Sequence, residues 1–132
     1  MRLRSRHQRE EGTSAVELVL YMPLLMIAIL LTVQFALVYL GNQVASASAR
    51  EASRVARVTG DVGQGTTKGY SYAADLGKGV LENVEVDVRQ VGDNQMRVTV
   101  SGSAPQLLPF LDSPRVSEEV QGPIERFNPD AG

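Results

Sequence analysis

The sequence predicts an α+β protein with a long N-terminal transmembrane helix followed by a small antiparallel β-sheet ectodomain. Three observations support this. Residues 18–40 form an apolar run without a charged side chain, and about 20 such residues in a helix cross the hydrocarbon core of a bilayer. The segment from there to residue 59 is rich in alanine and lacks proline, so the helix is expected to continue. Beyond it, two segments alternate valine with polar residues, as half-buried strands do.

Length and composition limit what the chain can contain. Of its 132 residues, only about 70 remain for a folded domain once the membrane segment is subtracted, near the lower limit for a core that is stable alone. The sequence has no cysteine and one histidine, His7, which excludes disulfide frameworks and His/Cys metal sites. The acidic residues show no paired pocket signature, so we expect no enzyme activity, no cofactor and no metal ion.

The distribution of charge predicts a membrane orientation. The formal net charge is −2, but four arginines crowd the N-terminus: Arg2, Arg4, Arg6 and Arg9. Basic residues beside a membrane segment favour the cytoplasmic side, so we expect a single-pass protein with its N-terminus inside and its C-terminal domain outside the cytoplasm. Three further arginines lie beyond the run and weaken this asymmetry: Arg50, Arg54 and Arg57. Nucleic-acid binding is not expected.

Residues 1–12 are predicted to form a cytoplasmic leader, because they are mostly basic, polar or acidic. Three fates are open for the apolar run that follows. A secretory signal peptide would have a shorter apolar region and a small-x-small cleavage site; residues 45–47 supply such a site, although within a stretch expected to be helical. An uncleaved anchor is the second fate. The third is removal of the leader alone.

Four residues interrupt the apolar character of this first segment. Glu17 sits at its front edge, where an unpaired carboxylate is costly unless another group pairs with it. Pro23 removes a backbone donor, so a kink or a helix start is expected near it. Thr32 is expected to bond its own helix backbone. Gln34 is expected to lie near the outer end of the run, where water can reach it.

The predicted helix spans residues 13–59, which is longer than an anchor requires. Alanines recur at helical spacing and form a face that another helix could approach closely: Ala45, Ala49, Ala52 and Ala56. Three arginines fall on one side at i, i+4 and i+7: Arg50, Arg54 and Arg57. Two interpretations are open for them, a solvated face near lipid headgroups or contact with acidic groups of a neighbouring subunit.

Residues 60–132 are predicted to form a small extracytoplasmic α+β domain. Clustered glycines in residues 59–65 predict a flexible linker, and the absence of a GxxxxGK[ST] pattern argues against a phosphate site. Four-residue spacing of Tyr72, Leu76 and Val80 predicts a short helix over residues 70–81.

The most distinct element of this domain is a β-hairpin over residues 84–101, with residues 92–94 as its loop. A lone hairpin is marginal in water, so it must pack against the 70–81 helix, the outer half of the long helix, or a third strand around residues 116–124. The apolar loop 104–111 is expected to cover the open face of the sheet rather than to form a docking patch. The last residues, 128–132, are expected to be a frayed tail.

A family resemblance rests on motifs in the long helix. Gly12, followed five positions later by Glu17 and an apolar helix, is the arrangement on which prepilin peptidases act. With Pro23 six positions further on, it resembles the TadE-like family, minor pilins or pseudopilins of the tight-adherence (type IVc) pilus. Residues 49–54 resemble the family's Ala-Arg-Glu-x-x-Arg segment, and residues 122–127 resemble the C-terminal end of some members. The likeness is close over residues 12–58 and loose over the ectodomain.

The resemblance implies a pilin-like fold and a membrane-held precursor that prepilin peptidase cuts after Gly12, leaving Thr13 as the first residue. Glu17 and Pro23 would then serve assembly, with the glutamate pairing with the α-amino group of the next subunit's Thr13. The implied helix interface contains Arg50, Glu51 and Arg54. The implied partners are other pilins or pseudopilins, prepilin peptidase and the inner-membrane assembly platform.

Two departures from the major pilin of such a system favour a minor component: no tyrosine directly follows Glu17, and the chain is much longer. The role implied is pilus assembly, adhesion or related secretion at the cell surface. An alternative stays open, a membrane-anchored or secreted small binding domain without a filament role.

Overall fold

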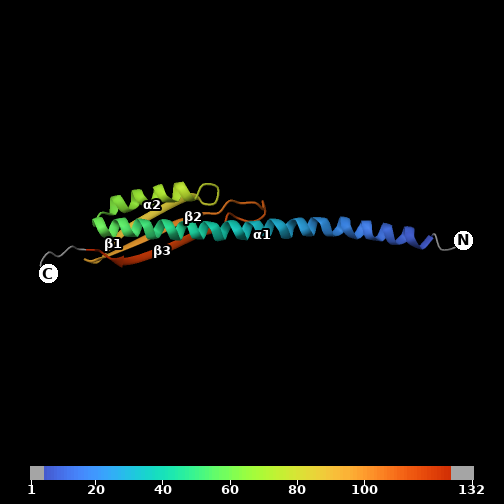
Figure 1. Ribbon diagram of the computed structural model, residues 1–132, viewed down its shortest axis with the longest axis horizontal. Coiled ribbons are helices and arrows are strands. Elements are labelled where there is room, and N and C mark those ends of the chain that lie inside the picture. The colour runs from blue at the N-terminus through green and yellow to red at the C-terminus, as the bar shows by residue number, and fades with distance from the viewer. Residues whose placement is uncertain (1–4, 126–132) are drawn as a thin grey trace. The chain divides into compact units, whose positions relative to one another are not determined.

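The computed structural model describes residues 5–125, with side chains from residue 14 onward. These residues form α1 (Ser5–Thr59), α2 (Val62–Leu76), β1 (Glu82–Val91), β2 (Gln95–Ser103) and β3 (Arg115–Pro123) (Figure 1). The predicted α+β class is confirmed, because a long apolar helix precedes a three-stranded antiparallel sheet. The expected tail at 128–132 lies outside the described residues, as do Arg126 and Phe127. The chain divides into two compact units, residues 1–33 and 34–132.

The first unit is the N-terminal part of α1. The helix begins at Ser5, so its backbone includes part of the segment that the sequence assigns to the leader, and it continues through Pro23. A helix start at that proline, one of two expected outcomes, is therefore wrong. The Thr32 hydroxyl donates to the Ala28 carbonyl oxygen at 2.8 Å, as expected. Among the described residues, one helix is long and apolar enough to cross a membrane, and an 18-residue stretch of it has a mean hydropathy of 2.4.

The second unit contains the sheet, whose strands follow the order β1-β2-β3. Val86 lies opposite Val100 in the first antiparallel pair, and Val98 lies opposite Val120 in the second. The predicted hairpin is confirmed, as is the third strand. Gly92 adopts a φ of +63° in the hairpin loop, a left-handed conformation that glycine accepts without steric cost.

One face of the sheet is apolar, because alternate side chains of a strand point to the same side. Its buried members are Val86, Val88, Met96, Val98, Val100 and Val116. The alanines predicted to form a small-residue face on α1 complete the same core: Ala45, Ala49, Ala52 and Ala56. All four are fully buried. The close approach expected of this face is therefore used within the chain.

The second helix differs from its prediction. It begins at Val62 and ends at Leu76, so the expected linker at 59–65 and the expected helix at 70–81 are both wrong in position. Asp61 caps the helix, since its side chain accepts from the backbone N–H groups of Gly63 and Gln64. At this end Gly65 is buried against α1, and a Cβ on it would lie 2.6 Å from that of Ala56. Here glycine permits close helix packing and does not break the helix.

The loop between β2 and β3 also differs from expectation. The inner face of the sheet is covered by the alanines of α1, while α2 packs against β1. Residues 104–111 instead lie along α1 and bond to it through Gln34 (Figure 1). Ala104 and Leu108 are buried, whereas Leu107, Phe110 and Leu111 are exposed. The prediction that the loop covers the sheet is wrong, because α1 already occupies that face.

Candidate processing and assembly segment

The predicted cleavage bond joins Gly12 to Thr13. Both residues lie within the helical backbone of α1, and their side chains are outside the described set. Four positions after Thr13, Glu17 is exposed on the helix, between the equally exposed apolar side chains of Val16 and Leu18. Among the described residues, Glu17 has no hydrogen-bond or ion-pair partner. A carboxylate on an apolar helix is thus available to a cation from outside the chain.

Pro23 lies about two turns beyond Glu17 on the same helix. Its ring joins four apolar side chains that line a shallow, open hollow on the helix surface: Leu18, Val19, Met22 and Met26. All four of these side chains are at least half exposed. A face of this kind is suited to lipid or to another apolar helix.

Glu51 and Arg54 form a two-pronged ion pair on the C-terminal part of α1. Arg54 Nη2 lies 2.6 Å from Glu51 Oε1, and Arg54 Nε donates to Glu51 Oε2 at 3.1 Å. The hydrogen bond from Arg54 is the main cause that lowers the pKa of Glu51, and the positive charges of Arg54 and Lys68 act in the same direction. The same hydrogen bond raises the pKa of Arg54. The pair is exposed at its arginine end, so its contribution to stability is small.

Residues 12–54 match the family model described as TadE-like protein. The match contains the predicted cleavage bond, Glu17, Pro23 and the Glu51–Arg54 pair, and it confirms the resemblance inferred from these motifs. It fits a minor-pilin-like protein associated with a Tad pilus and a single-pass membrane anchor. The TadE-like family is structural and non-enzymatic. Searches of curated proteins and of solved structures gave no match.

The arginines at the end of the TadE-like segment (residues 12–54) have separate roles. Arg57, three residues past it, is tied to the end of β3: its Nε donates to the Pro123 carbonyl oxygen at 2.7 Å, and its Nη2 lies 3.6 Å from Glu125 Oε1. Arg54 is engaged by Glu51. Arg50 is exposed and has no ion-pair partner among the described residues. Of the three arginines, Arg50 is therefore the one whose guanidinium is not engaged by another described residue.

Gln34, within the TadE-like segment, is a residue whose role the sequence did not indicate. Its expected contact with water is wrong, since the residue is only 6 % exposed. Its Nε2 donates to the Pro105 carbonyl oxygen, and its Oε1 accepts from the Leu107 N–H, both at 2.9 Å. Nothing in the sequence joins positions so far apart.

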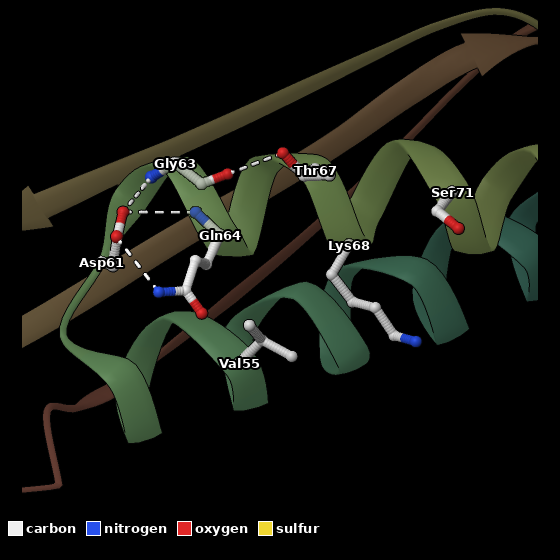
Figure 2. A pocket seen from close by; sticks show the side chains of 7 residues that line it. All are labelled: Val55, Asp61, Gly63, Gln64, Thr67, Lys68 and Ser71. Atoms are coloured by element: carbon white, nitrogen blue, oxygen red, sulfur yellow. Dashed lines mark hydrogen bonds between the residues drawn. The ribbon is translucent and has the colours of Figure 1, made fainter.

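A groove at the start of α2 lies apart from the TadE-like segment's motifs (Figure 2). It holds about 600 Å³ and is lined by Val55, Asp61, Gly63, Gln64, Thr67, Lys68 and Ser71. Asp61 accepts hydrogen bonds from the Gln64 backbone, the Gln64 side chain and the Gly63 backbone, and these lower its pKa. Because a carboxylate already occupies the N–H groups of this helix start, the geometry does not favour phosphate there. No cluster of metal-binding side chains occurs within the described residues.

Proposed function

We propose that this chain is a minor pilin or pseudopilin of a Tad-type (type IVc) pilus, processed by prepilin peptidase after Gly12 and acting in pilus assembly or adhesion. The observation that carries the proposal is the TadE-like match over residues 12–54. It coincides with an exposed apolar helix that bears the available Glu17 carboxylate near its inner end.

Glu17 acts in this proposal as the polar contact between subunits. Removal of residues 1–12 creates a positively charged α-amino group on Thr13. A carboxylate in an apolar environment is strongly disfavoured unless it is paired. In a bundle of staggered subunits, Glu17 pairs with the Thr13 amino group of the next subunit, and the surrounding apolar side chains supply the rest of the contact.

The remaining partners follow from the same arrangement. The N-terminus lies in the cytoplasm, where prepilin peptidase and the inner-membrane assembly platform act, and the C-terminal domain lies outside. Other pilins or pseudopilins pack against α1, with Arg50 and the Glu51–Arg54 pair at the helix interface. The exposed apolar side chains of residues 16–33 support such lateral packing.

The secretory alternative places a cut after Ala47, within α1. Ala45 and Ser48, on either side of that position, are fully buried within the ectodomain unit, which we define as residues 34–132. Cleavage there would separate Gln34 and Ala45 from the fold that they complete. The packing therefore supports retention of residues 34–47 of α1.

The processing step is tested by the mass and N-terminal sequence of the protein from membranes of cells with and without their prepilin peptidase. We expect a chain that begins at Thr13 only where the peptidase is present. A chain that begins at Ser48 would establish the secretory route, and one that begins at Met1 in both strains would establish an uncleaved anchor. Either result would overturn the proposed processing.

The assembly step is tested by Glu17→Gln, which keeps the size of the side chain and removes its charge. We expect normal membrane levels and normal processing but a loss of most surface pili. Glu85→Gln is the matched control, because Glu85 is exposed on β1, away from the TadE-like segment. Unchanged piliation in Glu17→Gln would exclude the subunit contact.

A further inference from the structure

Residues 104–111, the first part of the 104–114 connection between β2 and β3, present apolar side chains to the outside of the ectodomain unit (residues 34–132). These eight residues contain no charged side chain, and Asp112 follows them directly. The Phe110 residue is 69 % exposed, and Leu107 and Leu111 in the same loop are also exposed. An exposed cluster of large apolar side chains marks a contact with a partner or a membrane.

The attachment of this loop defines where it lies along α1. Gln34 holds it through two hydrogen bonds of 2.9 Å, one to the Pro105 carbonyl oxygen and one from the Leu107 N–H. Gln34 lies six residues before Leu40, the end of the uncharged run. At 1.5 Å per helical residue, it is about 9 Å inside that end. If residues 18–40 span the bilayer, the loop is at the depth of the acyl chains.

The hydrogen bonding of the loop suits a position with little water. Irregular backbone is tolerated at membrane depth only where its polar groups find partners. Gln34 supplies partners for two of them, and the Gln106 side chain donates to the carbonyl oxygens of Leu108 and Leu111. The Leu111 N–H also donates to the Leu108 carbonyl oxygen at 3.2 Å. Two of the eight residues are prolines, which have no N–H to satisfy.

The same arrangement gives Gln34 itself a partner. An amide inside a membrane span is costly unless it is hydrogen-bonded. Its donor and its acceptor are both used by the loop, so the helix and the loop satisfy one another.

We propose that residues 105–111 form a second membrane contact, inserting Leu107, Phe110 and Leu111 into the leaflet nearest the ectodomain while the precursor is in the bilayer. The occupant of this surface is lipid, because the loop is fixed beside a helical segment that belongs to the membrane span. The proposal rests on the membrane anchor of the proposed function and does not depend on cleavage after Gly12 or on pilus assembly.

The test uses the full chain in phosphatidylcholine vesicles whose acyl chains carry bromine, which quenches tryptophan on contact. The sequence contains no tryptophan, so Phe110→Trp introduces a single probe. Phe35→Trp, an exposed position within the span, is the control for membrane insertion. Val58→Trp, exposed near the outer end of α1, is the control for a position in water.

We expect Phe110→Trp to lose most of its emission in brominated vesicles, as Phe35→Trp does, while Val58→Trp keeps its emission. Emission of Phe110→Trp that matches the Val58 variant would overturn the inference and leave the anchor intact. An unquenched Phe35 variant would overturn the anchor and the inference together. If Phe110→Trp is shielded without quenching, and only at high protein-to-lipid ratios, a second copy covers the loop and the lipid assignment is wrong.

Phe110→Cys provides an independent readout, because the chain has no native cysteine. We expect it to resist a membrane-impermeant maleimide in intact vesicles and to react after detergent is added. Val58→Cys should react in both conditions when the ectodomain faces the reagent. Equal reactivity of the two variants in intact vesicles would contradict insertion.

Discussion

At the scale of single residues, Gln34 has the largest structural role of the polar side chains in the apolar run. Replacing it with leucine removes the partners of the Pro105 carbonyl oxygen and the Leu107 N–H. A buried group left without a partner costs about 1–3 kcal/mol, so we expect Gln34→Leu to lower the free energy of unfolding of the full chain in detergent by about that amount. Hydrogen exchange at the Leu107 amide should accelerate as well.

Thr32→Val is the matched control for that change. Thr32 bonds only to the Ala28 carbonyl oxygen one turn earlier, and that oxygen can still accept the helical hydrogen bond of the backbone. We expect its unfolding midpoint to stay close to that of the parent chain. Equal losses in the two variants would mean that a polar atom in the run matters for reasons other than the contact with the loop.

Asp61 gives a pH-dependent prediction at the same scale. Hydrogen bonds from Gln64 and Gly63 lower its pKa in the folded state, so the stabilisation by its carboxylate is complete above the unfolded-state pKa, about 4. It is lost as pH falls through the lower folded-state value. We expect the amides of Gly63 and Gln64 to lose exchange protection over this acidic range.

Asp61→Asn separates this effect from other titrations. Asparagine keeps an accepting oxygen for the N-cap but has no proton to gain in this range. In this variant, the exchange protection of the Gly63 and Gln64 amides should change less with pH than it does in the parent chain. An identical pH response in the two proteins would assign the effect to other carboxylates.

At the scale of secondary-structure elements, the contact between α1 and α2 depends on small residues. A Cβ on Gly65 would lie 2.6 Å from the Ala56 Cβ and 3.1 Å from the Ala52 carbonyl oxygen. Because α1 is held against the sheet, α2 would have to move. We expect Gly65→Ala to lower the free energy of unfolding by about 1–3 kcal/mol, as overpacking does, although alanine is the better helix former.

Ser71→Ala, on the exposed side of α2, tests the same propensity without the contact. It should leave stability equal or slightly raised in denaturant unfolding. If Gly65→Ala also stabilises the protein, the two helices are not as close as the structure places them.

The same contact explains which elements could be predicted from the sequence. The strands were predictable because the alternation of valines is local to each strand. The helix α2 was not predictable in the same way, because clustered glycines locally indicate a loop, whereas Gly65 and Gly69 lie buried one turn apart against α1. Their four-residue spacing, which Ala73 continues, was the available signal. The link from Gln34 to residues 105–107 arises only from tertiary structure.

For the candidate site, the residues of the proposed processing motif could be predicted from the sequence, whereas the contacts of the arginines could not. Gly12, Glu17 and Pro23 could be proposed from the sequence, because the motif of the predicted processing signal is read along the chain and needs no fold. The contacts of Arg50, Arg54 and Arg57 could not be predicted in this way. Arg57, for example, bonds to Pro123 because of how the sheet packs on the helix.

At the scale of the whole molecule, the unit that contains the sheet begins at Gln34 and so includes part of the apolar run. This boundary is explained by the contacts that the part of α1 before Ser48 makes with the rest of the unit. A Cβ on Gly41 would meet the Val80 carbonyl oxygen at 3.2 Å and the Val116 side chain at 3.4 Å, and one on Gly77 would meet Val44. The start of β1 and the start of β3 therefore both rest on this part of the helix.

This arrangement predicts that a chain of residues 34–132 in mild detergent keeps the native ectodomain, whereas a chain of residues 48–132 does not. The shorter chain lacks Gln34, Gly41 and Ala45, so its loop and the ends of two strands lose their contacts. Small domains are stable by only about 5–15 kcal/mol. Losing all of these contacts should therefore abolish cooperative unfolding and the amide protection of β3. If both chains unfold with the same midpoint, the helix before Ser48 serves the membrane alone and the ectodomain folds independently of it.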